Sequence, residues 1–84
     1  MFGETYIGEV FKYEAQSGMA YFELAENLAL GQTLHLKGLK NDFIQTLEEM
    51  HVAYQDVEVA YRGDWVGIKV DLELQEHDKV FIQE

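Results

Sequence analysis

The sequence contains no cysteine and no proline. Without cysteine, disulfide bonds, thiolate nucleophiles and zinc sites with cysteine ligands are excluded. No stretch approaches the roughly 20 consecutive apolar residues that a membrane-spanning helix needs. Residues 1–6 also lack the basic start and apolar run of a secretory signal peptide. We therefore expect a cytoplasmic protein.

Basic residues are scarce, since six stand against sixteen acidic ones and the formal net charge is −10. Nucleic-acid binding draws much of its affinity from lysine and arginine side chains that displace counterions from phosphates. Nucleic acid is therefore not expected as a sole partner, and an acidic membrane surface should repel the chain as well. A second reading is that the charge only keeps a small protein soluble. The basic residues are scattered singly: Lys12, Lys37, Lys40, Arg62, Lys69 and Lys79.

The 84 residues are enough for one domain, which we place at 1–84. Several segments between glycines have the pattern of β-strands, among them Tyr6–Tyr13, Met19–Leu24 and Gln32–Lys37. The clearest alternation is in Trp65–Glu73, where one face would carry Val66, Ile68, Val70 and Leu72. Ser17-Gly18 suggests a hairpin turn, and Val80 with Ile82 suggests a last short strand.

Two segments have helical features instead. Asp42–His51 places Phe43, Leu47 and Met50 at helical spacing. Ala20–Leu30 is rich in residues that favour helix. From periodicity alone, Asp42–His51 would be a helix and the fold would be mixed α/β.

A series of sequence blocks resembles a known family. The blocks run over Ile7–Val10, Ala20–Leu24, Leu28–Gln32, Leu36–Gly38, Asp42–Met50 and Gly63–Val70. In this order they resemble small stand-alone translation elongation factor-like proteins. They are similar, more distantly, to the second domain of elongation factor Tu. They are also similar to the C-terminal domain of collagenase-like peptidases, some of which act in RNA hydroxylation.

The resemblance implies an all-β fold, a small closed six-stranded β-barrel of the translation-factor second-domain type. It implies that Asp42–Met50 is a strand, that Gly63-Asp64 forms a turn, and that Gly67 permits a bend or the close approach of another backbone. The sequence departs from the family at Gly31-Gln32 and His77-Asp78, where Gly-Asp is usual. No phosphate-binding loop is present, so we expect no GTP binding and no cofactor.

Catalytic and metal-binding patterns are weak. The single serine, Ser17, has no histidine near it in sequence and fits a turn. His35, His51 and His77 lack the spacing of metal ligands. We therefore predict no catalytic, cofactor or metal residues, and no enzyme activity.

Three aromatic residues, Tyr54, Tyr61 and Trp65, cluster around the connection into the best strand. Alternation places Trp65 on the face opposite Val66 and Ile68, and Tyr61 should lie close by across the turn. Exposed aromatic residues are enriched at protein interfaces, although Trp65 could instead cap the end of the barrel. The sequence thus predicts a non-catalytic, protein-interacting module, and the resemblance implies an association with translation or its regulation. The alternative is a detached accessory domain that assists RNA modification or binds RNA weakly.

Overall fold

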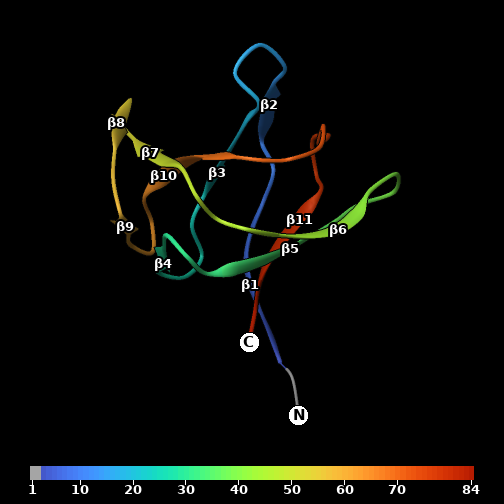
Figure 1. The fold of residues 1–84 in the computed structure, drawn as a ribbon, viewed down its shortest axis with the longest axis horizontal. Helices are drawn as coiled ribbons and strands as arrows, with labels where there is room; N and C mark the ends of the chain where they lie inside the picture. Colours follow the sequence, from blue (N-terminus) through green and yellow to red (C-terminus); the bar gives the residue numbers. More distant parts are fainter. Residues whose placement is uncertain (1–2) are drawn as a thin grey trace.

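The computed structural model describes residues 3–84, a range that contains strands and no helix. Consequently, no helix in this range could cross a membrane. The all-β prediction is confirmed, and the Asp42–Met50 segment is extended rather than helical. In chain order (Figure 1), the strands are β1 (Glu4–Glu9), β2 (Lys12–Glu14), β3 (Met19–Glu23), β4 (Leu28–Ala29), β5 (Thr33–Lys37), β6 (Asp42–Thr46), β7 (Met50–Val52), β8 (Gln55–Asp56), β9 (Val59–Ala60), β10 (Trp65–Lys69) and β11 (Lys79–Gln83).

The strands pair in antiparallel fashion as three sheets. A four-stranded sheet has the order β1-β11-β5-β6, and a five-stranded sheet has the order β2-β3-β10-β7-β8. The short strands β4 and β9 form a third, two-stranded sheet. The predicted closed six-stranded barrel is not confirmed, because this pairing does not join the described strands into one ring.

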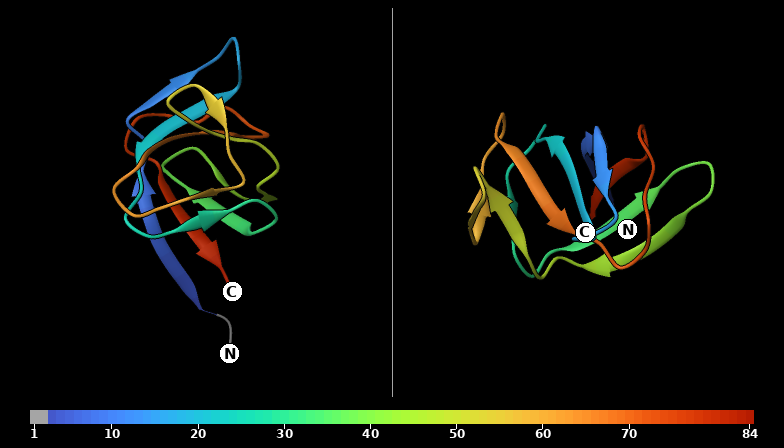
Figure 2. Two further views of the ribbon diagram at one scale, coloured as in Figure 1. Left: turned by 90° about the vertical axis from the view of Figure 1, so that its left-hand side faces the viewer. Right: turned by 90° about the horizontal axis from the view of Figure 1, so that it is seen from above.

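Two segments pass from one large sheet to the other without a reversal of the chain. The chain leaves β1 and enters β2 through residues 10–11, and it leaves β6 and enters β7 through residues 47–49. Backbone hydrogen bonds hold both corners. The Phe11 N–H donates to the Tyr21 carbonyl at 2.9 Å, and the Lys69 N–H donates to the Glu49 carbonyl at 3.1 Å. Figure 2 shows how the two sheets curve around a common interior.

One hydrophobic core lies between the inner faces of the sheets. Leu34 and Leu36 of β5 and Val66 and Ile68 of β10 are buried in it, as their alternation predicts. Full burial of such a side chain contributes about 1.5–3 kcal/mol. The prediction that Leu72 continues this inward face is wrong. Its side chain is half exposed because β10 ends at Lys69, three residues earlier.

The side chain of Gln45 connects β6 with the end of β10. It is buried, donates to the Lys69 carbonyl at 2.9 Å and accepts from the Asp71 N–H at 2.8 Å. A side-chain amide thus replaces the ladder hydrogen bonds that a paired strand would supply there.

Two glycines, one before β10 and one within it, are required by the local structure. Gly63 has φ +94°, and the Asp64 N–H donates to the Tyr61 carbonyl at 2.9 Å, which closes the turn before β10. At Gly67, a Cβ atom would lie 2.7 Å from Cε1 of Tyr21. The group that approaches Gly67 closely is therefore a tyrosine ring and not, as predicted, another backbone.

The first and last strands lie side by side. β1 pairs with β11 so that Glu4 is opposite Gln83, and the Glu84 N–H donates to the Gly3 carbonyl at 2.9 Å. The two ends of the described chain therefore meet at one end of the molecule (Figure 1).

Candidate functional site

The outer face of the five-stranded sheet carries a row of directly opposed residues. Lys12 is opposite Tyr21, Tyr21 is opposite Gly67, Gly67 is opposite His51, and His51 is opposite Asp56. The row therefore crosses all five strands. Gly67 has no side chain, so the Tyr21 ring can lie over the backbone of β10.

Trp65 lies on the same outer face, two residues before Gly67 and opposite Glu23. Its side chain is 53% exposed, whereas the neighbouring Val66 is 1% exposed. The indole packs edge-to-face against Phe11, which is 65% exposed, with ring centroids 5.5 Å apart. The outward position predicted for Trp65 is confirmed.

Two hollows lie beside these rings. One of about 200 Å³ is bordered by Tyr21, Tyr54 and Trp65, and Gly67 of β10 also borders it. A second of about 270 Å³ is bordered by the same three aromatic residues and by Phe11. We call Phe11, Tyr21, Tyr54 and Trp65 together the aromatic surface.

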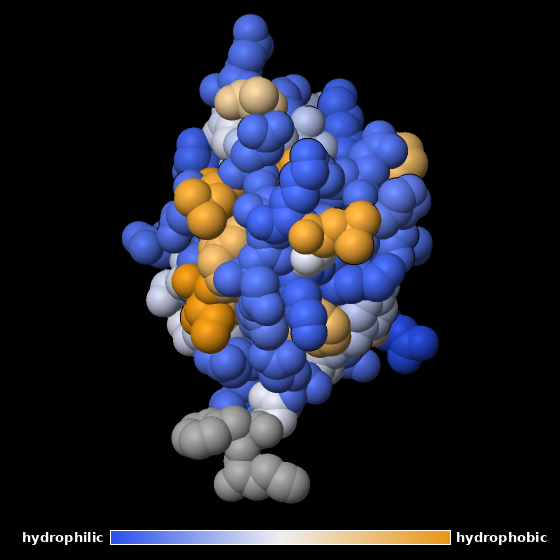
Figure 3. Space-filling model, turned by 90° about the vertical axis from the view of Figure 1, so that its right-hand side faces the viewer, coloured by the Kyte–Doolittle hydropathy of each residue, from blue (hydrophilic) through white to orange (hydrophobic). Residues whose placement is uncertain are grey.

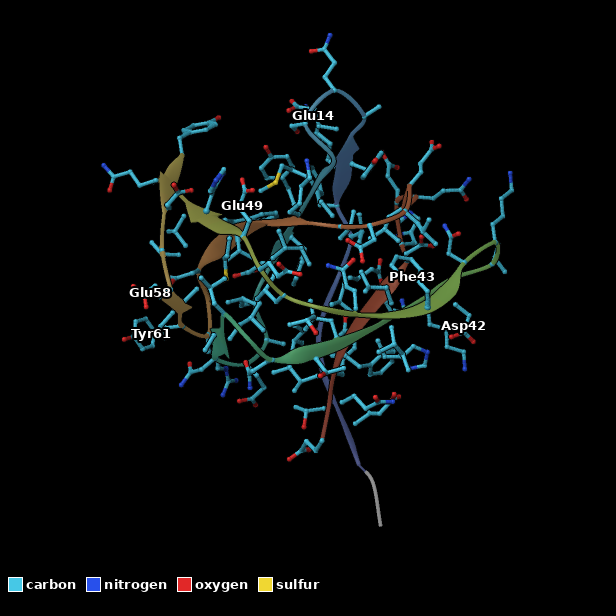
Figure 4. The ribbon with its side chains drawn as sticks, viewed as in Figure 1. Glu14, Asp42, Phe43, Glu49, Glu58 and Tyr61 are labelled. Atoms are coloured by element: carbon cyan, nitrogen blue, oxygen red, sulfur yellow. The ribbon has the colours of Figure 1, made fainter. Side chains whose placement is uncertain are left out.

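Two of the three predicted aromatic residues thus share these hollows. Tyr54 is 95% exposed and lies in the tight turn between β7 and β8, at φ 64°. Tyr61 does not border either hollow. It is exposed near Glu58, alongside β9 (Figure 4), and its N–H donates to the Asp64 carboxylate at 2.9 Å.

Sequence reasoning missed Phe11 and Tyr21. Phe11 could have been found from its place directly after the inward Val10, since neighbouring residues of a strand face opposite ways. The same alternation places Tyr21 outward, between the buried Ala20 and Phe22, but its contact with Gly67 depends on the pairing of β3 with β10.

A cluster of Glu49, His51 and Asp56 lies beside the aromatic surface. Nε2 of His51 is 3.1 Å from Oε2 of Glu49 and 2.7 Å from Oδ1 of Asp56. The ligand atoms of the three residues lie within 4.8 Å of one another, so they could provide three ligands to a cation. Contacts between both carboxylates and the His51 ring account for the same arrangement. The spacing in sequence did not reveal the cluster, because it forms across the β7–β8 hairpin.

His35, on β5, lies between two carboxylates of the four-stranded sheet. Nε2 is 2.5 Å from the Asp42 carboxylate, and Nδ1 is 2.6 Å from the Glu4 carboxylate. Both ring nitrogens can donate only in the charged imidazolium form. The hydrogen bond to Asp42, and next the one to Glu4, raise the pKa of His35, and burial opposes them.

Lysine and arginine neutralise little of the acidic surface. Within residues 3–84, the one carboxylate that forms an ion pair with either residue type is that of Glu9, which contacts Lys79 and also His77. The hydrogen bonds from Lys79 and then His77 lower the pKa of Glu9. The other ion pairs in this range are made by histidines.

The opposite side of the molecule differs from the aromatic surface. Figure 3 shows the side that carries β6, where hydrophilic residues dominate and the apolar patches are separated from one another.

The only serine, Ser17, donates to the Glu14 carboxylate at 2.6 Å within the β2–β3 turn, so its contacts are those of a turn residue.

No family model matches the sequence. The chain is 29% identical over 77 residues to an uncharacterized protease of Methanocaldococcus jannaschii, covering 90% of this chain and 19% of that protein. It is 31% identical over 80 residues to a collagenase of Porphyromonas gingivalis, covering 93% of this chain and 22% of that protein. The chain thus spans about a fifth of the length of these relatives.

Two crystal structures share the fold. Both are of the C-terminal domain of a Geobacillus thermoleovorans protein assigned as a U32 peptidase, one of them a selenomethionine variant. The TM-scores are 0.84 and 0.83, at 19% identity, over 95% and 89% of this chain and 92% and 95% of those chains. The similarity to peptidase C-terminal domains is confirmed at the level of the fold. The similarity to elongation factors stays a prediction from the sequence blocks.

Proposed function

We propose that this chain is a non-catalytic module that binds a protein partner through the aromatic surface. The observation that carries the proposal is the gathering of Phe11, Tyr21, Tyr54 and Trp65 on one outer sheet face. Three of these residues are more than half exposed: Phe11, Tyr54 and Trp65. Large aromatic side chains provide most of the binding energy in many protein interfaces, particularly where they can enter or border a pocket.

The position of Trp65 supports a role in binding rather than in folding. Its immediate neighbours along β10, Val66 and Gly67, are buried, whereas the indole extends outward and contacts Phe11. A partner that covered both rings would remove apolar surface from water without altering the core. This would gain about 25 cal/mol per Å² of buried apolar area.

The relatives support an accessory role. The matched region is about a fifth of each curated relative, and the fold is that of a domain crystallised apart from the rest of its protein. We infer that the chain acts in the cytoplasm without GTP or another cofactor, alongside a larger partner that performs any chemistry. A translation partner remains a prediction from the sequence blocks.

For the architecture, we propose that the two large sheets form one ring of six strands. The continuous segments β1–β2 and β6–β7 would each count as a single strand shared by both sheets. Supporting this, each corner is crossed by a backbone hydrogen bond, and Gln45 bonds across the β6–β10 gap.

The test uses the tagged chain and a Trp65→Ala variant as baits in extracts of the native host, followed by reconstitution with the purified partner. We expect the wild type to bind a protein partner directly in calorimetry. The variant should bind at least about tenfold more weakly, the effect of losing an interface hot spot. Tyr61→Ala is the matched control, because Tyr61 is exposed outside the hollows. Equal affinity of wild type and Trp65→Ala would refute the proposed surface. Partner-free binding of RNA would favour the accessory role in RNA modification.

A further inference from the structure

The smaller hollow of the aromatic surface has a composition suited to a cation. Tyr21 from β3, Tyr54 from the β7–β8 turn and Trp65 from β10 border about 200 Å³ of open space. The faces of aromatic rings carry negative charge density and attract ammonium and guanidinium groups. Guanidinium groups also stack well on these faces.

Carboxylates lie beside residues that border this hollow, on two sides of it. On one side, His51 borders the hollow, and its ring is contacted by Glu49 and Asp56. On the other side, Trp65 and Phe11 border a larger hollow of about 470 Å³ that also includes Glu23 and Glu76. Within residues 3–84, neither Glu23 nor Glu76 forms an ion pair.

One cation opposes these carboxylates locally. The ammonium group of Lys12 borders both the larger hollow and the 270 Å³ hollow, where Glu14 also lies. The local excess is therefore acidic, and the net charge of −10 adds a long-range attraction for cations.

Charge decides among the possible occupants. A second copy of this chain, RNA and an anionic membrane would each bring more negative charge to the same face. A neutral segment would cover the rings but leave the carboxylates of Glu23 and Glu76 without partners. We infer that the partner contributes a basic segment, which places an arginine or lysine side chain in the hollow between Tyr21, Tyr54 and Trp65. This inference rests on the proposed function.

The experiment measures fluorescence anisotropy of dye-labelled nine-residue peptides in 150 mM salt. The peptides alternate glycine with arginine, lysine, glutamine or glutamate. We expect the arginine and lysine peptides to bind and the neutral and acidic ones not to bind. Tyr54→Ala should weaken binding about threefold to tenfold, as expected for loss of one cation–π contact and its packing. Tyr61→Ala, the same change outside the hollow, should leave the affinity unchanged.

Two carboxylate variants separate a local site from diffuse attraction. Glu23→Gln and Glu58→Gln change the net charge equally, but Glu23 is opposite Trp65 and Glu58 lies near β9 (Figure 4). We expect Glu23→Gln to weaken peptide binding about twofold, the scale of a partly exposed ion pair, and Glu58→Gln to have less effect. Thermal melts establish that each variant is folded.

The outcomes also separate this inference from the proposed function. Equal binding of the glutamine peptide, or equal effects of Tyr54→Ala and Tyr61→Ala, would overturn the basic-segment inference. A natural partner that needs Trp65 but docks through a neutral segment would leave the proposed function standing and remove this inference. A partner that binds wild type and Trp65→Ala with equal affinity would refute both the proposed function and the basic-segment inference.

Discussion

Replacing Gln45 with leucine should destabilise the domain strongly, although the two side chains have similar volumes. Two hydrogen bonds connect the carboxamide of Gln45 to the segment at the end of β10, one to the Lys69 carbonyl and one from the Asp71 N–H. Leucine would leave both backbone groups without their partner. Each such loss costs about 1–3 kcal/mol. Because solvent can reach part of this site, we take the lower half of that range, about 2–4 kcal/mol in total.

Urea unfolding followed by circular dichroism measures this loss. For a domain of this size, with a slope of about 1 kcal/mol per molar urea, the midpoint should fall by about 2 M or more. Gln55→Leu, on the exposed strand β8, is the control and should change stability by less than about 0.5 kcal/mol. A loss below about 1 kcal/mol for Gln45→Leu would refute the view that this amide joins β6 to β10.

A Gln45→Glu variant tests the direction of each hydrogen bond. Glutamate can still accept from the Asp71 N–H, but its ionised form cannot donate to the Lys69 carbonyl. The protonated carboxyl can donate, so folding favours it and raises the pKa of that group. The deficit of this variant relative to wild type should therefore shrink as the pH falls. A deficit that does not depend on pH would contradict this assignment.

Four further predictions follow from the structure. Trp65→Ala should cost about 1.5 kcal/mol or less in urea unfolding, because the indole is half exposed; a loss of about 3 kcal/mol, typical of a buried aromatic residue, would make it structural. Gly67→Ala should cost about 1–3 kcal/mol in the same assay, because the new methyl group displaces the Tyr21 ring; unchanged stability would contradict the close approach. The difference in unfolding free energy between wild type and His35→Gln gives the stabilisation from His35. This difference should be complete below the ordinary pKa of 6.5 and be lost as the pH rises through the raised pKa of the folded state. A difference that grows with pH would contradict the prediction. Generic RNA should bind more weakly than about 100 µM at physiological salt in an anisotropy titration; sub-micromolar binding would show that the charge argument fails.

Alternation of side chains predicted the strands that have one buried and one exposed face. Thr33–Lys37 and the first half of Trp65–Glu73 could be read in this way, and so could the outward position of Trp65. The hairpin at Ser17-Gly18 was predicted from turn chemistry, and Gly18 indeed has φ +71°. For Asp42–Met50 the local pattern favoured a helix, and only the resemblance gave the extended conformation. Pairing with β5 there outweighs local helix propensity.

The features that the sequence did not reveal depend on strand register. The alternation of β10 was expected to continue to Leu72, but pairing stops at Lys69, where Gln45 takes over the backbone groups. Similarly, the cluster around His51 and the place of Tyr21 arise from residues opposed across strands. No spacing along the chain encodes such contacts, because the register is set by packing of the whole sheet.

The pairing of β1 with β11 has a mechanical consequence. Glu4 and Gln83 are opposed at the end of an antiparallel pair, so a force that pulls the two termini apart acts across the hydrogen bonds rather than along the strands. The hydrogen bonds between the two strands then break one after another, because each bears the full force in turn. The domain should therefore yield at low force when stretched from its termini. Attachment at Glu4 and Lys79, which lie at opposite ends of the β1–β11 pair, would load the same strands in shear and should transmit a greater force before the fold opens.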